Sequence, residues 1–339
     1  MKKYLISNEG QFYKANLHCH TTFSDGKLTP AEVKELYQSL GYSIVAYTDH
    51  GIFITHDELT DENFLSLHGC EYDVCDDDPP TWAQKRNCHF CAIAIDPETI
   101  IQPFWHRTRY LYRNRELVKF DESKPDYDKY FTGECITEMM TGLRDAGFFV
   151  TYNHPVWSLE HYPEYMGYSG MHALEMFNGG CLVNGYDDYN PHVYDDLLMS
   201  GKKIYCIGAD DNHNYAPLSS RYNDSGVAFT MIKAKSLEYR EVMRALLAGD
   251  VYASEGPIIN ELYYEDGYVH IKTEPADRIF ISYDIREAKI AYGEKEFITE
   301  ASFKIPTNAK YFRITVVDKC GKHACTNGYF LEDFMENEV

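Results

Sequence analysis

The sequence predicts an α/β fold followed by a small all-β domain, and two observations lead to this prediction. Up to about residue 256, short apolar runs rich in β-branched residues alternate with amphipathic stretches of helical period. That alternation is typical of a mostly parallel sheet, either open or closed into a barrel. After "SEGPIIN" (254–260) the helical period stops, and short alternating strands separated by Asp-Gly, Gly and Pro turns follow.

The first part contains clear strand and helix candidates. The runs that predict strands are 43–50, 87–96, 148–155, 172–180 and 202–213. The stretches that predict helices are 29–41, 132–147 and 236–249, each of which ends on a glycine. In the first of these, Thr29 is the expected N-cap, Pro30 takes the first helical position, Glu32 completes a capping box and Gly41 ends the helix.

We therefore expect two domains, 1–256 and 257–339, the second a β-sandwich of roughly 80 residues. The segment 102–131 fits neither pattern, because it is aromatic and carries four closely spaced arginines. We expect it to be an insertion that lies over one face of the first domain.

Composition limits the classes of function. The chain has 339 residues, 44% of them hydrophobic and 25% charged, with a net charge of −21. Nucleic acid and anionic membranes are not the expected partners, because both would repel it. No apolar run approaches the roughly 18 residues of a membrane helix or forms a signal peptide, so we expect a cytoplasmic protein with reduced cysteines. Cys88 and Cys91 have CxxC spacing, but no second pair follows to form a zinc knuckle.

Metal-binding residue types follow the apolar runs. The His, Asp and Glu residues at the ends of these runs are His18, His20, Asp49, His50, Glu71, His89, His154, Asp210, Asp211 and His213. The carboxyl ends of parallel strands gather at one face of a sheet, so these side chains are expected to share one cleft. Residues two apart in a strand point the same way, so His18 and His20 are expected to bind one ion together, as are Asp211 and His213. A nitrogen and oxygen donor set without thiolate suits Zn, Mn or Fe, and there is room for two or three divalent ions.

The motifs "NLHCHTTFSDGKLTPAEV", "YTDHG", "YNHP" and "GADDNH" resemble, in this order, the four motifs of the PHP (polymerase and histidinol phosphatase) family. The resemblance covers residues 15 to about 256. It implies a distorted (β/α)7 barrel with a trinuclear metal centre, and a small β domain also occurs behind such barrels.

Carried over position by position, the resemblance implies three ligand sets. The first is His18, His20, Glu71 and Asp211. The second shares Glu71 and adds His89 and His154, and the third is Asp25, His50 and His213. Asp211 is preferred over Asp210 because Asp210 would be out of phase with His213 in a strand.

The expected function is hydrolysis of a small phosphate ester (a phosphomonoester, nucleotide or cyclic phosphate) by metal-activated hydroxide. Asp25 and His213 are the candidate acids for the leaving group. Arg107, Arg109 and Arg221 are the candidate phosphate-binding residues, although a solvated surface on which arginines pair with nearby acids is the favoured explanation. Asn153, Trp157 and Glu175 are expected to orient ligands or line the pocket.

Two alternatives stay open at this point. The same site is suited to a carboxyl ester, carbamate or amide, which an apolar pocket built from Trp105, Tyr110 and Trp157 would favour. The β domain is also a candidate for binding a polymer or a partner. The histidines expected to lie outside the site are His56, His68, His106, His161, His172, His192, His270 and His323.

Overall fold

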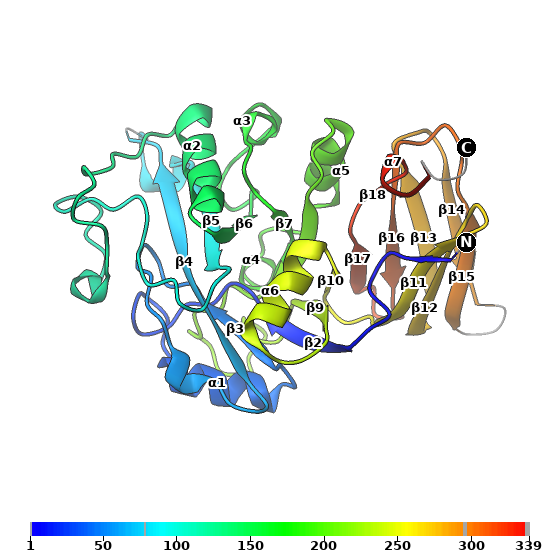
Figure 1. The fold of residues 1–339 in the computed structure, drawn as a ribbon, viewed down its shortest axis with the longest axis horizontal. Helices are drawn as coiled ribbons and strands as arrows, with labels where there is room; N and C mark the ends of the chain where they lie inside the picture. The colour runs from blue at the N-terminus through cyan, green and yellow to red at the C-terminus, as the bar shows by residue number, and fades with distance from the viewer. Residues whose placement is uncertain (1, 78, 294–296, 336–339) are drawn as a thin grey trace.

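A sheet of fourteen strands organises the structure, a computed structural model that describes residues 2–77, 79–293 and 297–335 (Figure 1). Its main path runs β14-β13-β16-β17-β10-β9-β2-β3-β4-β5-β6-β7-β8, with β18 paired to β16. The strands of its first part are β2 (Gln11–Asn16), β3 (Ile44–Tyr47), β4 (Leu65–Cys75), β5 (Asn87–Ala94), β6 (Phe148–Tyr152), β7 (Ala173–Asn178), β8 (Tyr205–Ala209), β9 (Phe229–Ala234) and β10 (Val251–Ser254).

The parallel core that the sequence predicts is present, with one interruption. Strands β2, β3 and β4 are parallel to one another, as are β6, β7 and β8. Strand β5 is antiparallel to both of its neighbours. The described part of the connection from β4 to β5 includes a short 3-10 turn, Trp82–Gln84. The connection as a whole, residues 76–86, is shorter than the crossover of about a dozen or more residues that a parallel pair needs.

The two ends of this curved run of strands meet beyond β2 and β8. Cys19 and Asn212 form a parallel bridge. The Asp211 amide donates to the His18 carbonyl at 3.0 Å, and the His20 amide donates to the Asn212 carbonyl at 3.1 Å. The contact places the residues that follow the first and the last of these strands side by side.

The predicted helices are confirmed. They are α1 (Pro30–Ser39), α2 (Gly133–Asp145) and α6 (Tyr239–Ala248). Helix α1 has the expected capping box, in which the Thr29 hydroxyl accepts from the Glu32 amide and the Glu32 carboxylate accepts from the Thr29 amide. Gly249 ends α6 with a φ of 74°, a conformation that favours glycine.

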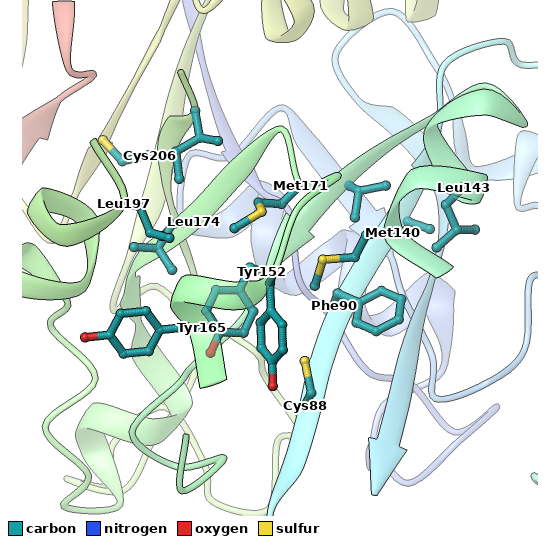
Figure 2. Packing of buried hydrophobic residues seen from close by; sticks show 14 of the residues in the cluster. Cys88, Phe90, Met140, Leu143, Tyr152, Tyr165, Met171, Leu174, Leu197 and Cys206 are labelled. Atoms are coloured by element: carbon teal, nitrogen blue, oxygen red, sulfur yellow. The ribbon is translucent and has the colours of Figure 1, made fainter. Parts of the chain in front are cut away.

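Helices α2, α3 (Tyr162–Gly167) and α5 (Pro191–Met199) pack on the outer face of the strands from β5 to β8. Figure 2 shows the resulting core, in which Phe90 and Tyr152 of the sheet meet Met140 and Leu143 of α2. All four side chains are fully buried. This packing fixes the strands, and so fixes the positions of the polar residues that follow them.

After residue 256, the residues that the structure describes form strands and their connections, together with one short helix, α7 (Glu332–Met335). Its strands are β11 (Ile259–Glu265), β12 (Tyr268–Ala276), β13 (Arg278–Tyr283), β14 (Ala288–Tyr292), β15 (Ile298–Lys304), β16 (Tyr311–Val317), β17 (His323–Thr326) and β18 (Tyr329–Phe330). A second sheet, β1-β11-β12-β15, includes the N-terminal strand β1 (Lys3–Tyr4) and packs on the β13 and β16 region through residues such as Leu262 and Ile314.

The two parts of the chain are continuous rather than merely linked. Strand β17 pairs with β10, so the C-terminal strands extend the large sheet. The buried Arg313 guanidinium of β16 donates to the Asp195 carboxylate of α5 at 2.7 and 2.6 Å, forming a bidentate pair. Within the part of the chain that is described, no helix is long and apolar enough to cross a bilayer.

Candidate metal centre

Nine side chains gather where the carboxyl ends of the strands meet. Seven of them line a pocket of about 670 Å³, namely Asp25, His50, Glu71, His89, His154, Asp211 and His213. The other two, His18 and His20, are fully buried. These are the nine residues that the family resemblance implies as ligands.

Glu71, on β4, is at the centre of the cluster and is itself fully buried. Its Oε1 lies 2.9 Å from His89 Nδ1, 3.1 Å from His18 Nε2 and 3.3 Å from His154 Nε2. Its Oε2 lies 2.8 Å from His50 Nδ1. One carboxylate therefore contacts imidazoles from several parts of the chain and belongs to two of the groups that could hold a metal ion.

Asp211 closes the far side of the cluster, beside the HxH pair. Its Oδ1 lies 3.0 Å from His20 Nε2 and 3.2 Å from His18 Nε2. The two Nε2 atoms are themselves 3.1 Å apart. Asp211 has a φ of 51° and His154 a φ of 24°, so two of the candidate ligands adopt a left-handed backbone that non-glycine residues rarely take.

A more open group stands at the mouth of the pocket. Asp25 Oδ1 lies 3.4 Å from His213 Nε2 and 3.9 Å from His20 Nδ1, and Asp25 Oδ2 lies 3.8 Å from His50 Nε2. The Asp25 side chain is 49% exposed and the His213 side chain 22%. These two are therefore among the candidate ligands that a substrate reaches most easily.

The cluster divides into four overlapping groups whose donor atoms lie within 4.8 Å of one another. They are His20, Asp25, His50 and His213; His18, Glu71 and His154; His18, His20 and Asp211; and His50, Glu71 and His89. The third ligand set that the resemblance implies, Asp25, His50 and His213, is therefore found in one group, which also contains His20. His89 and His154, implied as partners, fall in different groups that share Glu71.

Buried acids fix the histidines in place. Glu175, on β7, accepts a hydrogen bond from His18 Nδ1 at 2.7 Å and from the His154 amide at 3.1 Å. The Asn178 side chain donates to Glu175 at 3.0 Å and to Asp211 at 3.1 Å. With Nδ1 held by Glu175, the Nε2 atom of His18 is directed at the cluster.

Two further carboxylates shape the loops that carry Asp25 and His213. Asp49 accepts hydrogen bonds from the Thr21 and Ser24 amides at 2.8 and 3.0 Å, which fixes the turn before Asp25. Asp224 accepts from the His213 amide at 2.7 Å. Asp49 ends an apolar run and could be marked from the sequence, whereas nothing in the sequence set Asp224 apart.

Asp211, and not its neighbour Asp210, joins the cluster, but for a different reason than strand phase. Strand β8 ends at Ala209, before either residue. The Asp210 carboxylate accepts from the Gly226, Val227 and Ala228 amides at 2.6 to 2.8 Å. Burial raises its pKa to about 6. Asp210 thus anchors the chain beside the site, while the left-handed turn at Asp211 directs that side chain into it.

The charges of the cluster are strongly coupled. Burial opposes protonation of His18 and His20, but the carboxylates of Asp211 and Glu71 outweigh it and raise the pKa of both imidazoles well above the usual range. The same carboxylates raise the pKa of His154 to about 9 in spite of burial. In return, the imidazoles lower the pKa of Glu71 and Asp211 although burial acts the other way.

The structure brings none of the three candidate arginines to the pocket. Arg107 donates to Asp126 at 2.5 Å and to the carbonyls of Glu122 and Lys124. Arg109 donates to Asp128 at 2.6 Å. Arg221 is exposed and is not among the lining residues. Arg107 and Arg109 therefore pair with acids on the surface of the segment 102–131, as the favoured explanation of these arginines expects.

Other predicted residues are near the cluster. The Trp157 ring lies 5.1 Å from both the His89 and His154 rings and lines the pocket. Asn153 is buried and hydrogen-bonds with Thr151 at 2.7 Å. Within the described residues, the eight histidines expected to be outside the site belong to none of the ligand groups.

A second polar network on the pocket wall was not predicted. Asp73, two residues after Glu71 on β4, contacts the Tyr112 hydroxyl and accepts from Lys129 Nζ at 3.1 Å. Lys129 Nζ also lies 2.8 Å from the Tyr112 hydroxyl. Tyr112 and Lys129 both come from the segment 102–131, which is therefore attached to the rim of the site. The alternation of Glu71 and Asp73 on one face of a strand was the available signal.

These residues fit divalent metal ions. Glu71 Oε2 and Asp211 Oδ1 are buried, and although imidazole nitrogens lie 2.8 to 3.2 Å from them, none of the contacts from described residues has the geometry of a hydrogen bond. A buried carboxylate oxygen left in that state is costly unless a cation occupies the space beside it. Six imidazoles and three carboxylates, with no cysteine in any group, form a donor set suited to Zn, Mn or Fe. The clusters are consistent with a site for several ions.

Comparison with known proteins adds a likeness of fold. No protein-family model and no curated protein matches the sequence. Among solved structures, the chain is similar to a two-domain protein from Bacteroides vulgatus containing a predicted PHP-like metal-dependent phosphoesterase. The identity is 16%, with 96% of this chain and 97% of that chain covered and a TM-score of 0.45.

Two shorter structures are also similar. One, assigned as a metal-dependent phosphoesterase from Bifidobacterium adolescentis, is 17% identical over 63% of this chain and 91% of its own, with a TM-score of 0.39. The other is an amidohydrolase from Chromobacterium violaceum with bound sulfate and no metal. It is 18% identical over 59% of this chain and 87% of its own, with a TM-score of 0.34. At these identities the likeness concerns the fold.

Proposed function

We propose that the chain is a metal-dependent phosphoesterase that hydrolyses a small phosphate ester. The observation that carries the proposal is the convergence of six imidazoles and three carboxylates on one pocket, where two buried carboxylate oxygens face imidazole nitrogens of the described residues without hydrogen-bond geometry. Two or three divalent ions would bring about four to six positive charges against those three carboxylates. That surplus suits an anionic phosphoryl group better than a neutral carbonyl. Zn, Mn and Fe are the ions we propose.

The protein's own residues have separate tasks in this reaction. Bound divalent ions supply a water molecule activated near neutral pH and stabilise charge on the phosphoryl oxygens. Glu71 would help to hold the ions, and Glu175 would keep the imidazole of His18 oriented toward them. The His213 and Asp25 pair stands at the mouth. With ions held only by the groups that do not contain His213, its Nε2 would be free to hold the proton that passes to the leaving oxygen.

We also propose that strands β2 to β8 form a distorted seven-stranded (β/α)7 barrel. The bridge between Cys19 and Asn212 supports closure beyond β2 and β8, since it joins the residues that follow the first and last strand. Closure of this kind would explain why polar residues distant in the sequence, such as His18 and Asp211, share one pocket.

A second candidate function is hydrolysis of a carboxyl ester, carbamate or amide at the same centre. One observation favours it: none of the residues lining the pocket, within the described part of the chain, is a lysine or arginine. The apolar pocket expected for this alternative is only partly present, because Trp157 lines the metal pocket while Trp105 and Tyr110 line other cavities.

The test is hydrolysis by protein stripped of metal and reloaded separately with Mn, Zn and Fe. The substrates are phosphomonoesters, nucleotides, cyclic phosphates, carboxyl esters and amides. Asp211→Asn should lose both bound metal and phosphate release, whereas His192→Ala, a change at an exposed histidine outside the ligand groups, should lose neither. Hydrolysis of carboxyl esters without any release of phosphate would replace the proposal by the second candidate.

A further inference from the structure

The walls of the pocket beyond the ligands are aromatic, amide-bearing and acidic, and no described residue of these walls is cationic. Four rings and two amides face the space in front of the cluster, namely those of Tyr112, Trp157, Tyr186, Tyr215, Asn87 and Asn184. Sites that bind phosphate groups usually add arginine or lysine donors to any metal. Here no such side chain is among the lining residues that the structure describes.

The nearest cations are engaged elsewhere. The Lys129 ammonium is buried behind the wall, where it lies 3.1 Å from the Asp73 carboxylate and 2.8 Å from the Asp73 carbonyl. Lys27 lies over the Tyr215 ring at 4.4 Å, and Arg113 donates to the Ser24 carbonyl at 3.5 Å. Both are exposed at the rim.

The carboxylates of the wall work against added negative charge. Asp73 and Asp224 both line the pocket beside the candidate ligands. Lys129 already pairs with Asp73, so a phosphoryl group away from the metals would meet the Asp224 carboxylate with no lysine or arginine among the described lining residues, inside a chain of net charge −21. Juxtaposed like charges are a common means of rejecting the wrong ligand.

We propose that the substrate carries one phosphoryl group, which the metals receive, and that the rest of the molecule is uncharged and hydroxylated, as in a sugar or polyol monophosphate. This inference rests on the proposed phosphoesterase function. Phenol, indole and amide groups can hydrogen-bond to hydroxyls and pack against a sugar ring, so the walls suit such a group. A second phosphate would be a liability at this site.

The reaction is balanced with water as the only co-reactant. The oxygen of water forms a bond to phosphorus while the bond from phosphorus to the ester oxygen breaks. The proton that water gives up passes to that ester oxygen, and the products are inorganic phosphate and the alcohol.

The test compares glucose 6-phosphate with glucose 1,6-bisphosphate, which differ by one phosphoryl group. With manganese-loaded protein, we expect kcat/KM for phosphate release to be at least about 10-fold higher for the monophosphate. Equal or faster turnover of the bisphosphate would overturn the inference, and would indicate that Lys27 or Arg113 reaches the second phosphoryl group.

A charge introduced at the wall should change this ratio. Tyr186 lines the pocket and is 43% exposed, so Tyr186→Arg can place a cation there without disturbing the core. We expect it to reduce the preference for the monophosphate several-fold. Tyr292→Arg, at a residue 61% exposed on β14, adds the same charge far from the pocket and should leave the ratio unchanged. Equal ratios in all three proteins would contradict the proposed role of the wall.

Binding separates failure of this inference from failure of the proposed function. Titration calorimetry with the methylene phosphonate analogues of the two sugars needs no turnover. The charge inference is supported if the monophosphonate binds more tightly than the bisphosphonate and if Tyr186→Arg reduces this difference in affinity. This holds even if neither sugar ester is hydrolysed. In that case the phosphoesterase proposal fails for these substrates. Equal binding of the two analogues overturns the charge inference alone.

Discussion

The metal cluster and the arginine-rich segment 102–131 both carry residues with obvious chemical potential, but the fold uses them differently. The six histidines and three carboxylates come from distant parts of the sequence and converge within contact distance of one another. Arg107 and Arg109 come from one segment and pair with Asp126 and Asp128 of that same segment. Convergence follows from strands held by a packed core, whereas local pairing satisfies a charge wherever the segment lies. Residues at strand ends are thus the stronger functional signal in this chain.

The comparison is tested most strongly at the centre of the cluster. Glu71→Gln keeps the shape but removes the charge that five imidazoles approach within 3.3 Å. We expect metal content, measured by elemental analysis, to fall sharply and hydrolysis to fall by more than about 100-fold, the upper end for groups that only orient ligands. Glu98→Gln, at an exposed glutamate, is the matched control. Full metal content and activity in Glu71→Gln would refute the assignment of the centre.

Much of the site could be predicted from the sequence because its residues are placed by strands. His18 and His50 follow the ends of strands whose apolar runs are easy to recognise, and Glu71 lies within the next strand. Parallel neighbours bring such positions together. The interruption of the sheet at β5 was harder to foresee, because strand direction depends on how a connection travels rather than on the composition of the strand.

Residues placed by turns were predicted less well. The sequence favoured Asp211 over Asp210 because residues two apart in a strand point the same way. In the structure, Asp211 reaches the cluster through a left-handed turn that follows the strand. Tyr112 and Lys129 reach the wall because an irregular segment folds back onto Asp73, and no periodic pattern records that contact. The large sheet also runs through the predicted boundary at residue 256, since β17 pairs with β10.

A smaller loss of metal affinity is expected when a residue that orients a ligand, rather than a ligand itself, is changed. Glu175→Gln replaces the carboxylate that accepts from His18 Nδ1 at 2.7 Å with a neutral amide. Such orienting partners typically contribute a factor of about 10 to 100 in metal affinity. We expect a loss of that size in competition with a fluorescent chelator, with the fold retained by circular dichroism. An unchanged affinity would mean that the neighbouring backbone alone orients His18.

The pH dependence of stability should distinguish the cluster from an ordinary charged surface. The pKa of His154 is raised to about 9 because Glu71 and Asp211 outweigh the effect of burial. Because the pKa of His154 is higher in the folded than in the unfolded state, its protonation stabilises the fold. This stabilisation is complete below the unfolded-state pKa of about 6.5 and is lost as the pH rises through about 9. We therefore expect the metal-free protein to lose on the order of 1–3 kcal/mol of unfolding free energy between pH 6.5 and 9.

The metal-loaded protein should behave differently over the same range, because dications take the place of the protons and bind more tightly as the imidazoles deprotonate. Urea unfolding at pH 6.5, 8 and 9, with chelator or with manganese, measures both. Metal-free protein whose stability is constant or rises with pH would show that the imidazoles are not coupled to the carboxylates as described.

The smallest effect is expected in the arginine segment, where the comparison predicts almost none. The Arg109 side chain is 60% exposed and its pair with Asp128 is solvated, and such pairs contribute about 0.2–1 kcal/mol to stability. Arg109→Ala should therefore leave KM and kcat for a phosphate ester unchanged and shift the unfolding free energy by no more than that.

Lys129→Ala, in the same segment, is the informative partner, because Lys129 is buried and contacts both Asp73 and Tyr112 on the pocket wall. It should raise KM, since its loss releases that wall. A rise in KM for Arg109→Ala as large as that for Lys129→Ala would mean that the segment approaches the substrate in a way its paired, exposed arginines do not suggest. The distinction between converged and locally paired residues would then no longer hold for this chain.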